Sequence, residues 1–404
     1  MSEIPLLLLL LLVIAILLRL DFVYYLVYVL AGSYILARWR TGRNLNQLRI
    51  VRRYTDHIFL GETVGVDIEI ANTSWWPVPW LRCDETSPHS LATGSGAIRQ
   101  VIALRPKERT RLHYDLVGRR RGCYELGPAL LSTGDLFGFA EAHGRMEQRD
   151  YLTVYPRVIP LGQLRLTSRS PLGTIKSQQH IFADPARITG VREYRAGDPL
   201  RSVDWKNSAR VGQLQVKKHE PAVSLTSLIV LEMNTESFGR QTRVSASEWG
   251  IVVAASLANH LVGQRQAVGL ACNGLDALTG AACWTISPRP GRVHLMRLLE
   301  WLARVQTTET PPLADWLPAA TVDLAWGATV IIVAPTGDEA ICRASHRLLQ
   351  RGLNPVLVVI ESYYQFGVVR ERARRLGFTA QMVADERDLR QWAFAAAGAQ
   401  RLII

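Results

Sequence analysis

The N-terminal sequence contains two predominantly apolar runs, which a short charged segment separates. The runs cover residues 4–18 and 22–37, and Arg-Leu-Asp occupies positions 19–21. One continuous helix over both runs would be about 50 Å long, whereas a hydrocarbon core is about 30 Å thick. It would also place Arg19 and Asp21 near the bilayer centre, where each charge costs roughly 2.5–3.5 kcal/mol. The pattern therefore predicts a transmembrane hairpin of two helices that turns at the charged segment.

Basic side chains cluster directly after the second apolar run. Arg38, Arg40 and Arg43 begin this cluster, and the first acidic residue after them is Asp56. Because basic residues flanking a span stay on the cytoplasmic side, the cluster places this end of the hairpin in the cytoplasm. The sequence therefore predicts a cell-membrane protein in contact with lipid, with two spanning helices and both termini cytoplasmic. A cleaved secretory signal is disfavoured, because no basic segment precedes the first run and no small-residue cleavage site follows it.

Residues 45–160 show a period of two that is typical of strands. In the run ETVGVDIEIAN, Val64, Val66 and Ile68 alternate with polar or small residues, and segments rich in glycine and proline separate such runs. Short alternating runs at this spacing predict an antiparallel β-sandwich of immunoglobulin-like type. The loop SWWPVPW at residues 74–80 either caps one end of the sandwich or forms a binding platform.

Residues 226–404 contain apolar strands that alternate with amphipathic helices. The runs SLIVLEM, AVGLAC, TVIIVAP and NPVLVVI predict buried strands, and helical patterns separate or follow them. This alternation predicts a doubly wound parallel sheet. We expect four parts along the chain: a transmembrane hairpin with a basic segment (1–44), a β-sandwich domain (45–160), a connecting segment (161–225) and an α/β domain (226–404).

The carboxyl ends of the predicted parallel strands carry polar side chains. The first strand ends in LEMNTES, where Glu232, Asn234 and Glu236 occupy alternate positions, and Asp338 follows a later strand. Ligands of doubly wound sheets bind at this edge, and oxygen ligands suit a hard cation such as Mg²⁺. The same residues could instead cap helices and end loops. No glycine-rich nucleotide-binding motif, HExxH or GxSxG occurs in the sequence, so nucleotide binding and the common hydrolase classes lack support.

A charged segment, REYRAGDPLRSVDWKNSAR, lies between the two predicted domains. Paired guanidinium and carboxylate groups predict a polar knot in which Trp205 packs inward, and a docking surface for a partner is compatible with that knot. A nucleic-acid site is disfavoured because a phosphate track needs one sign of charge, and catalysis lacks a nearby nucleophile–base pair. The residues expected to form the knot or docking surface are Arg192, Tyr194, Arg195, Gly197, Asp198, Arg201, Asp204, Trp205 and Arg210.

Charge and cysteine content add two constraints. The net charge of +12 favours an anionic partner, and beside a predicted membrane span that partner is the lipid headgroup layer. The five cysteines include no CxxC pair, so a disulfide framework or a zinc site is not expected, and a reducing compartment fits the sequence.

The segment VREYRAGDPLRSVDWKNSARVGQLQVKKHEP resembles the signature of the domain of unknown function 58 family, and RRRGCYELGP, GDLFGF and LTVYP agree with it in order. This resemblance covers almost the whole chain. It implies a membrane-anchored bacterial or archaeal protein whose α/β domain is von Willebrand factor A-like. Proteins of this family are often encoded beside MoxR-type AAA+ ATPases, and a chaperone-adaptor role has been suggested for the pair.

The chain departs from the metal motif of A domains, which reads Asp-x-Ser-x-Ser after the first strand. Glu232, Asn234 and Glu236 stand at these positions, so the acid is longer and both hydroxyls are lost. We therefore expect no tight Mg²⁺ binding and no other cofactor. The predicted function is a membrane-anchored adaptor or scaffold, not an enzyme, whose cytoplasmic α/β domain binds another protein, an AAA+ ATPase. The alternative is a membrane-bound metal-dependent hydrolase that uses the strand-end carboxylates.

Overall fold

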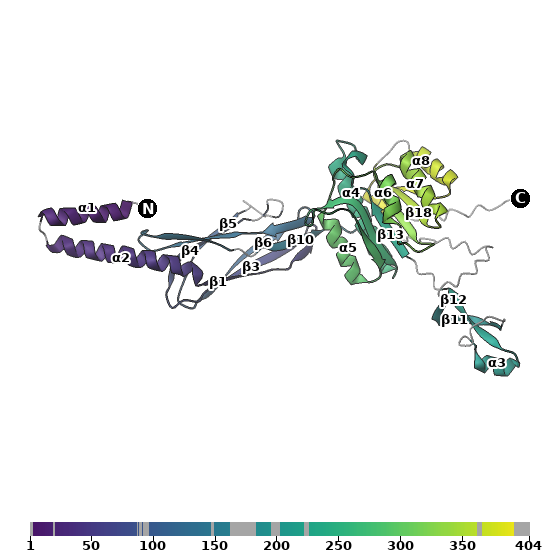
Figure 1. Ribbon diagram of the computed structural model, residues 1–404, viewed down its shortest axis with the longest axis horizontal. Helices are drawn as coiled ribbons and strands as arrows, with labels where there is room; N and C mark the ends of the chain where they lie inside the picture. The colour runs from purple at the N-terminus through teal and green to yellow at the C-terminus, as the bar shows by residue number, and fades with distance from the viewer. Residues whose placement is uncertain are drawn as a thin grey trace. The chain divides into compact units, whose positions relative to one another are not determined.

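The computed structural model of the chain forms two compact units (Figure 1). Unit 1 comprises Met1–Val158, Leu275–Ala281 and Met296–Gln306, and unit 2 comprises Ile159–Gly274, Ala282–Leu295 and Thr307–Ile404. Within these units the structure describes residues 3–18, 21–86, 88, 91, 97–146, 149–161, 183–194, 203–221, 226–361 and 366–391.

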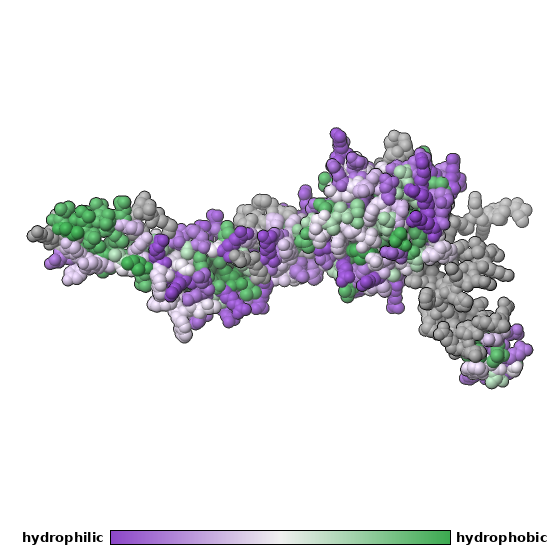
Figure 2. Space-filling model, viewed as in Figure 1, coloured by the Kyte–Doolittle hydropathy of each residue, from purple (hydrophilic) through white to green (hydrophobic). Residues whose placement is uncertain are grey.

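Unit 1 begins with two apolar helices, α1 (Glu3–Leu18) and α2 (Asp21–Asn46). Most of their large apolar side chains are exposed, among them Phe22 at 75% and Tyr25 at 70%, and Figure 2 shows them gathered on the surface. Among the described helices, α2 is long and apolar enough to cross a membrane, and α1 contains a shorter apolar stretch. The predicted N-terminal apolar helix is confirmed, and α2 continues through the basic cluster beyond its predicted end at residue 37.

Among the described residues that follow α2 in unit 1, strands β1 to β10 form three sheets. The sheet orders are β1-β3-β6, β2-β10-β7 and β5-β4-β8-β9, with antiparallel pairing except between β2 and β10. The strands are β1 (Leu48–Arg53), β2 (His57–Phe59), β3 (Thr63–Asn72), β4 (Val78–Thr86), β5 (Ala97–Leu104), β6 (Arg109–Val117), β7 (Gly122–Leu126), β8 (Ala129–Gly134), β9 (Glu141–Arg145) and β10 (Asp150–Tyr155). The predicted β-rich part is therefore confirmed, and the parallel pair β2–β10 was not foreseen.

Strand β3 shows how the sequence pattern builds the core of unit 1. Val66, Ile68 and Ile70 are at most 1% exposed, while the residues between them are half-buried or exposed. Side chains of a strand point to alternate faces, so one face packs inward against residues such as Leu81 and Leu152. Burial of this apolar face, at roughly 25 cal/mol per Å², is the main stabilisation of the sheet.

A buried ionic cluster lies within the same core. The Arg52 guanidinium donates to Glu85 over 2.5 Å and also to Asp150, and the Arg52 and Glu85 side chains are 0% and 1% exposed. Burial raises the pKa of Glu85, and the charge of the neighbouring Arg52 lowers it in part. The cluster thus depends on Arg52 to compensate two carboxyl groups away from water.

Arg121, in the sequence GRRRGCYELGP, binds the end of a helix within unit 1. Its Nη1 donates to the carbonyl oxygens of Leu302, Ala303 and Val305 over 2.9–3.1 Å. Helix α5 (Arg292–Arg304) ends there, and a guanidinium satisfies the free carbonyl groups of a last turn. The Arg121 side chain therefore caps the C-terminal end of α5.

Unit 2 contains most of a mixed sheet of order β15-β14-β13-β17-β18-β19, and β16 pairs with β14. The pairs β14–β13, β13–β17, β17–β18 and β18–β19 are parallel, whereas β14–β16 is antiparallel. Its elements are β13 (Thr226–Leu231), η2 (Thr235–Ser237), α4 (Arg243–Gly263), β14 (Ala267–Asp276), β15 (Ala282–Arg289), β16 (Val305–Gln306), α6 (Leu313–Ala320), β17 (Thr329–Ala334), α7 (Glu339–Gln350), β18 (Asn354–Val359), α8 (Phe366–Leu376), β19 (Thr379–Met382) and α9 (Glu386–Arg390). The predicted parallel strands are present, and the sheet as a whole is mixed.

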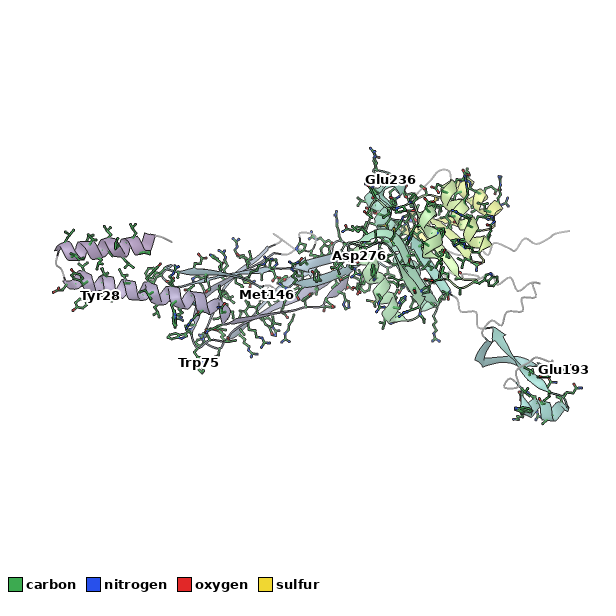
Figure 3. All side chains as sticks on the ribbon, in the orientation of Figure 1. Tyr28, Trp75, Met146, Glu193, Glu236 and Asp276 are labelled. Carbon is green, nitrogen blue, oxygen red and sulfur yellow. The ribbon has the colours of Figure 1, made fainter. Side chains whose placement is uncertain are left out.

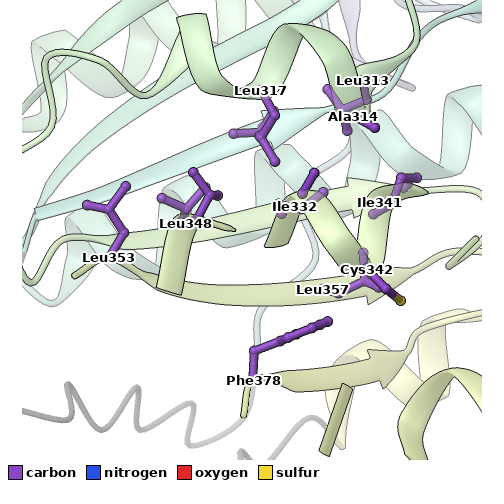
Figure 4. Close-up of a cluster of buried hydrophobic side chains, with 14 of the residues drawn as sticks. Leu313, Ala314, Leu317, Ile332, Ile341, Cys342, Leu348, Leu353, Leu357 and Phe378 are labelled. Atoms are coloured by element: carbon purple, nitrogen blue, oxygen red, sulfur yellow. The ribbon is translucent and has the colours of Figure 1, made fainter. Parts of the chain in front are cut away.

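Helices cover both faces of this sheet. On one face α6, α7 and α8 bury residues such as Leu317, Leu348 and Val369 against β17 and β18 (Figure 4). On the other face α4 packs so closely at Gly250 that a Cβ atom there would lie 2.8 Å from Ile360 Cδ1 and 3.4 Å from Leu231 Cδ1. Two covered faces explain why the central strands are apolar throughout rather than alternating.

A separate hairpin and helix of unit 2 hold the charged segment. Strand β11 (Ala183–Glu193) pairs antiparallel with β12 (Gln215–Pro221), and α3 (Trp205–Val211) lies between them in sequence.

Candidate functional site

The strand order of the mixed sheet identifies where a ligand crevice would lie. After β13 the chain forms β14 on one side and later returns to form β17 on the other side, so the order reverses at β13. Ligands of open α/β sheets bind beyond the carboxyl ends of the strands at such a switch point. Glu232 directly follows β13, Asn273 lies near the end of β14, and Asp338 follows β17.

Glu232 is buried and fully engaged with neighbouring groups. Its carboxyl is 1% exposed, and its Oε1 accepts from Asn273 Nδ2 over 2.7 Å and from the Asn234 amide over 3.1 Å. The Ser237 side chain and the Leu313 backbone also hydrogen-bond to this carboxyl group. Asn273 in turn accepts from the Met233 amide over 2.7 Å. The carboxyl group therefore ties three segments of the chain together at the switch point.

The other residues of the predicted cation site have different roles. Glu236 is exposed in the turn η2, and its amide donates to Asn234 Oδ1 over 3.3 Å (Figure 3). Asp338 is the N-cap of α7 and accepts from the Ile341 amide over 2.7 Å. In the part of the chain that the structure describes, no three His, Cys, Asp or Glu side chains are grouped so that they could hold a metal ion. The geometry favours capping and loop bracing, the alternative role raised from the sequence.

Burial raises the pKa of Glu232, and its hydrogen bonds lower it only in part. The folded-state pKa therefore lies above the unfolded value of about 4.3, so the stabilising contribution is present at low pH and is lost as pH rises through the folded pKa. Glu232→Gln cannot ionise. We expect the melting temperature of the parent, relative to that of this variant, to fall as pH rises from about 4.3 and then to level off. A relative rise with pH in fluorescence-detected melting would instead indicate a stabilised carboxylate.

The charged segment is described in part. Arg195, Gly197, Asp198 and Arg201 lie outside the described residues, so the predicted polar knot among them stays a prediction. The backbone of Arg192 pairs with Val216 across the hairpin, and the Tyr194 amide donates to the Leu214 carbonyl over 2.9 Å. These contacts belong to the backbone of the hairpin.

Asp204 and Trp205 define the start of α3. Asp204 is the N-cap, and its side chain accepts from the amide and the side-chain nitrogen of Asn207 over 3.2 and 3.0 Å. Trp205 is 65% exposed, so the prediction that it packs inward is wrong. The reason is local: the N-cap fixes the phase of this short helix, and the first helical position points to solvent. Arg210, in the last turn, is exposed as well.

Asn273 is the site residue that sequence reasoning missed. It is a fully buried polar residue near the end of the apolar run AVGLACNG, and it holds Glu232 and the Met233 amide at once. A buried polar group needs hydrogen-bond partners, so an asparagine within a core strand signals a partner on a neighbouring strand end.

The fold places the chain in a class of proteins that combine an apolar N-terminal helix, a β-rich part and a mixed α/β sheet. Residues 190–325 match the model of a family described as "Protein of unknown function DUF58". A curated relative, "Uncharacterized protein YeaD" of Bacillus subtilis (strain 168), is 24% identical over 192 residues, which are 46% of this chain and 48% of that protein. The match thus spans about half the length of this relative. The family predicted from the signature is confirmed by these two findings.

Solved structures resemble the chain over about a quarter of its length. The CARDB domain of the PF1109 protein from Pyrococcus furiosus has a TM-score of 0.20 and 14% identity, over 26% of this chain and 91% of that one. Native alpha-2-macroglobulin from Escherichia coli has a TM-score of 0.23 and 21% identity, over 27% of this chain and 16% of that one.

Proposed function

We propose that this chain is a membrane-anchored adaptor or scaffold whose α/β part and charged segment bind another protein. In this proposal α1 and α2 form the membrane hairpin, both termini are cytoplasmic, and the α/β sheet is of the von Willebrand factor A-like type. The family resemblance adds the expected partner, a MoxR-type AAA+ ATPase. The cluster around Glu232 supports the scaffold role, because its carboxyl is used to brace the fold.

The exposed side chain of Trp205 is the observation that carries this proposal. Trp205 is 65% exposed, and two apolar residues that follow the charged segment, Val211 and Leu214, are 62% and 42% exposed. Tryptophan is enriched among the residues that dominate binding energy at protein interfaces. An exposed tryptophan beside further apolar surface is therefore suited to contact a partner rather than water.

The local structure holds Trp205 in a fixed orientation. The Asp204 side chain caps the start of α3, and Gly212 ends the helix in the left-handed conformation, with φ of 73°. Ser208 Oγ donates to the Asp204 carbonyl over 2.7 Å and accepts from the Gln215 amide over 2.8 Å, which ties α3 to β12. Because the side chain is presented by an ordered helix, binding would cost little additional conformational entropy.

Trp205→Ser is expected to abolish or strongly weaken partner binding while the fold melts normally. Loss of a central tryptophan typically costs about 2 kcal/mol or more, which is roughly a 30-fold loss in affinity. The measurement uses the full chain in nanodiscs and a purified MoxR-type ATPase from the same organism, with affinity read by biolayer interferometry. Partners captured from native membranes and identified by mass spectrometry provide the unbiased version.

Trp326→Ser is the matched control, because Trp326 is 66% exposed in a different loop of the same unit. It should leave binding unchanged. Equal binding by the parent and Trp205→Ser would reject Trp205 as the contact, and equal loss in both variants would assign the effect to general surface change. If both variants melt at the temperature of the parent, a loss of binding in Trp205→Ser reflects docking and not a structural role of Trp205.

A further inference from the structure

A rigid turn in unit 1 presents two large apolar side chains outward. Leu136 and Phe137, in the sequence GDLFGF, are 78% and 76% exposed. The Asp135 carboxylate accepts from the Phe137 amide over 2.8 Å and from the Ala140 amide over 2.7 Å, and Gly138 adopts a φ of 74°. The turn is therefore shaped by the hydrogen bonds to the Asp135 carboxylate.

This turn lies against the apolar part of α2. The rings of Tyr34 and Phe139 have centroids 6.5 Å apart, and Phe137 stacks on Phe139 at 5.5 Å. A shallow, mostly apolar cavity is lined by the α2 residues Leu36 and Ala37 together with the turn. The turn thus contacts α2 on both sides of the start of the basic cluster, since Arg40 and Thr41 line the same cavity.

The contact with α2 determines how deep the turn lies in a membrane that α2 spans. If the span ended before Tyr34, α2 would offer only Asp21–Ser33, a helix of about 20 Å. That is too short for a hydrocarbon core of about 30 Å, so Tyr34, Leu36 and Ala37 have to lie at or below the membrane surface. A turn that packs on these residues then lies at the same depth.

A second loop beside α2 carries the charge and aromatic pattern of a membrane interface. Trp75 and Trp76 are 80% and 59% exposed, and Trp75 projects outward in Figure 3. Arg40 of α2 lies over the Trp76 ring at 4.7 Å and donates to the Pro77 carbonyl over 2.8 Å, while Lys107 lies over the Trp75 ring at 4.9 Å. Tryptophan beside arginine and lysine is typical of the headgroup layer, where the ring is partly apolar and the cation meets lipid phosphate.

We propose that residues 74–77 and 135–139, which we name the aromatic tip, insert into the headgroup layer of an anionic bilayer beside α2. The Trp loop contacts the headgroups, and Leu136 and Phe137 reach the first part of the acyl chains. This inference rests on the proposed membrane anchoring by α2. It gives the β-rich part a fixed attachment to the membrane surface in addition to the helix.

The test uses the full chain in nanodiscs of phosphatidylcholine and phosphatidylglycerol, with the half-buried Cys123 and Cys283 replaced by alanine. One environment-sensitive fluorophore is attached at Leu136→Cys, at Val29→Cys within α2, or at Leu60→Cys. Leu60 lies beyond the Thr63 end of β3, whereas Asn72 at the other end donates to the Trp76 carbonyl, so Leu60 is about 30 Å from the aromatic tip. Quenching by lipids with a nitroxide near the headgroup or near the end of the acyl chain reports the depth of each label.

We expect the label at Leu136 to shift to the blue and to be quenched most by the shallow nitroxide. The label at Val29 should be quenched most by the deep one, and the label at Leu60 should be quenched by neither. An unquenched Leu136 beside a quenched Val29 overturns the aromatic tip and leaves the membrane anchor intact. An unquenched Val29 overturns the anchor itself. A Leu136 label shielded from aqueous iodide but not quenched by lipid would show that protein covers the tip, which also overturns the proposal.

Discussion

Replacing Arg52 by methionine is expected to lower the stability of unit 1 by about 3–5 kcal/mol. The substitution keeps an unbranched apolar stem but removes the guanidinium, and it leaves Glu85, at 1% exposed, and Asp150, at 14% exposed, without their shared cation. Uncompensated carboxyl groups in a core have to be desolvated or protonated, and both cost free energy. Chemical or thermal unfolding of the full chain, followed by a probe in unit 1, measures the effect, which should lower its melting temperature by roughly 6–20 °C.

Arg53→Met in the same strand is the matched control. The Arg53 side chain is 68% exposed and pairs with Glu69 at the surface, so its loss should change stability by no more than about 1 kcal/mol. An equal loss of stability in Arg52→Met and Arg53→Met would show that the buried ionic cluster stabilises unit 1 no more than the surface ion pair does. In a double variant, Glu85→Gln should recover part of the loss caused by Arg52→Met, because it removes one of the two carboxyl groups left unpaired.

Glu232→Ala is expected to destabilise unit 2 by about 3 kcal/mol or more. The variant removes the acceptor for the Asn273 side chain and the Asn234 amide, and each buried donor without a partner costs about 1–3 kcal/mol. If Glu232 were instead a metal ligand, its loss would matter mainly when the metal is bound. Thermal unfolding with and without millimolar Mg²⁺ separates the two cases.

We expect Mg²⁺ to change the melting temperature of the parent little, and the loss in Glu232→Ala to be the same with or without it. Saturation a hundredfold above Kd would add about 2.7 kcal/mol, which such a measurement detects readily. A clear shift that disappears in the variant would revive the metal-dependent hydrolase. Glu236→Ala, in the exposed turn of the same loop, should leave stability unchanged and serves as the control.

Elements whose residues interact along one strand or helix were predictable from the sequence. The alternation in β3 predicted which of its side chains are buried, because a strand turns successive residues to opposite faces. The helix that follows Asp338 was also predicted, since an N-cap acid before an amphipathic run marks a helix start. In contrast, α6 was missed because Pro318 interrupts its short pattern LADWLPAA.

The sequence pattern could not predict contacts between segments that are distant along the chain. Arg121 binds carbonyl groups of Leu302 and Val305, and nothing in its own neighbourhood of three arginines indicates which one meets a helix end. The partnership of Glu232 and Asn273 depends on β13 and β14 being neighbours in the sheet. The direction of the Trp205 side chain depends on which residue caps α3, and a cap one residue earlier or later would change that direction.

Unit 1 is discontinuous in sequence, since the stretches 275–281 and 296–306 complete what residues 1–158 begin. During synthesis the ribosome releases those last stretches on the order of ten seconds after residue 158. Until then Arg121 has no α5 end to bind, and Asp276 and Arg304, which pair at 3.2 Å within unit 1, have not been made. Helices α1 and α2 therefore emerge from the ribosome before the β-rich part can finish folding, and a gene truncated after residue 158 encodes an incomplete unit.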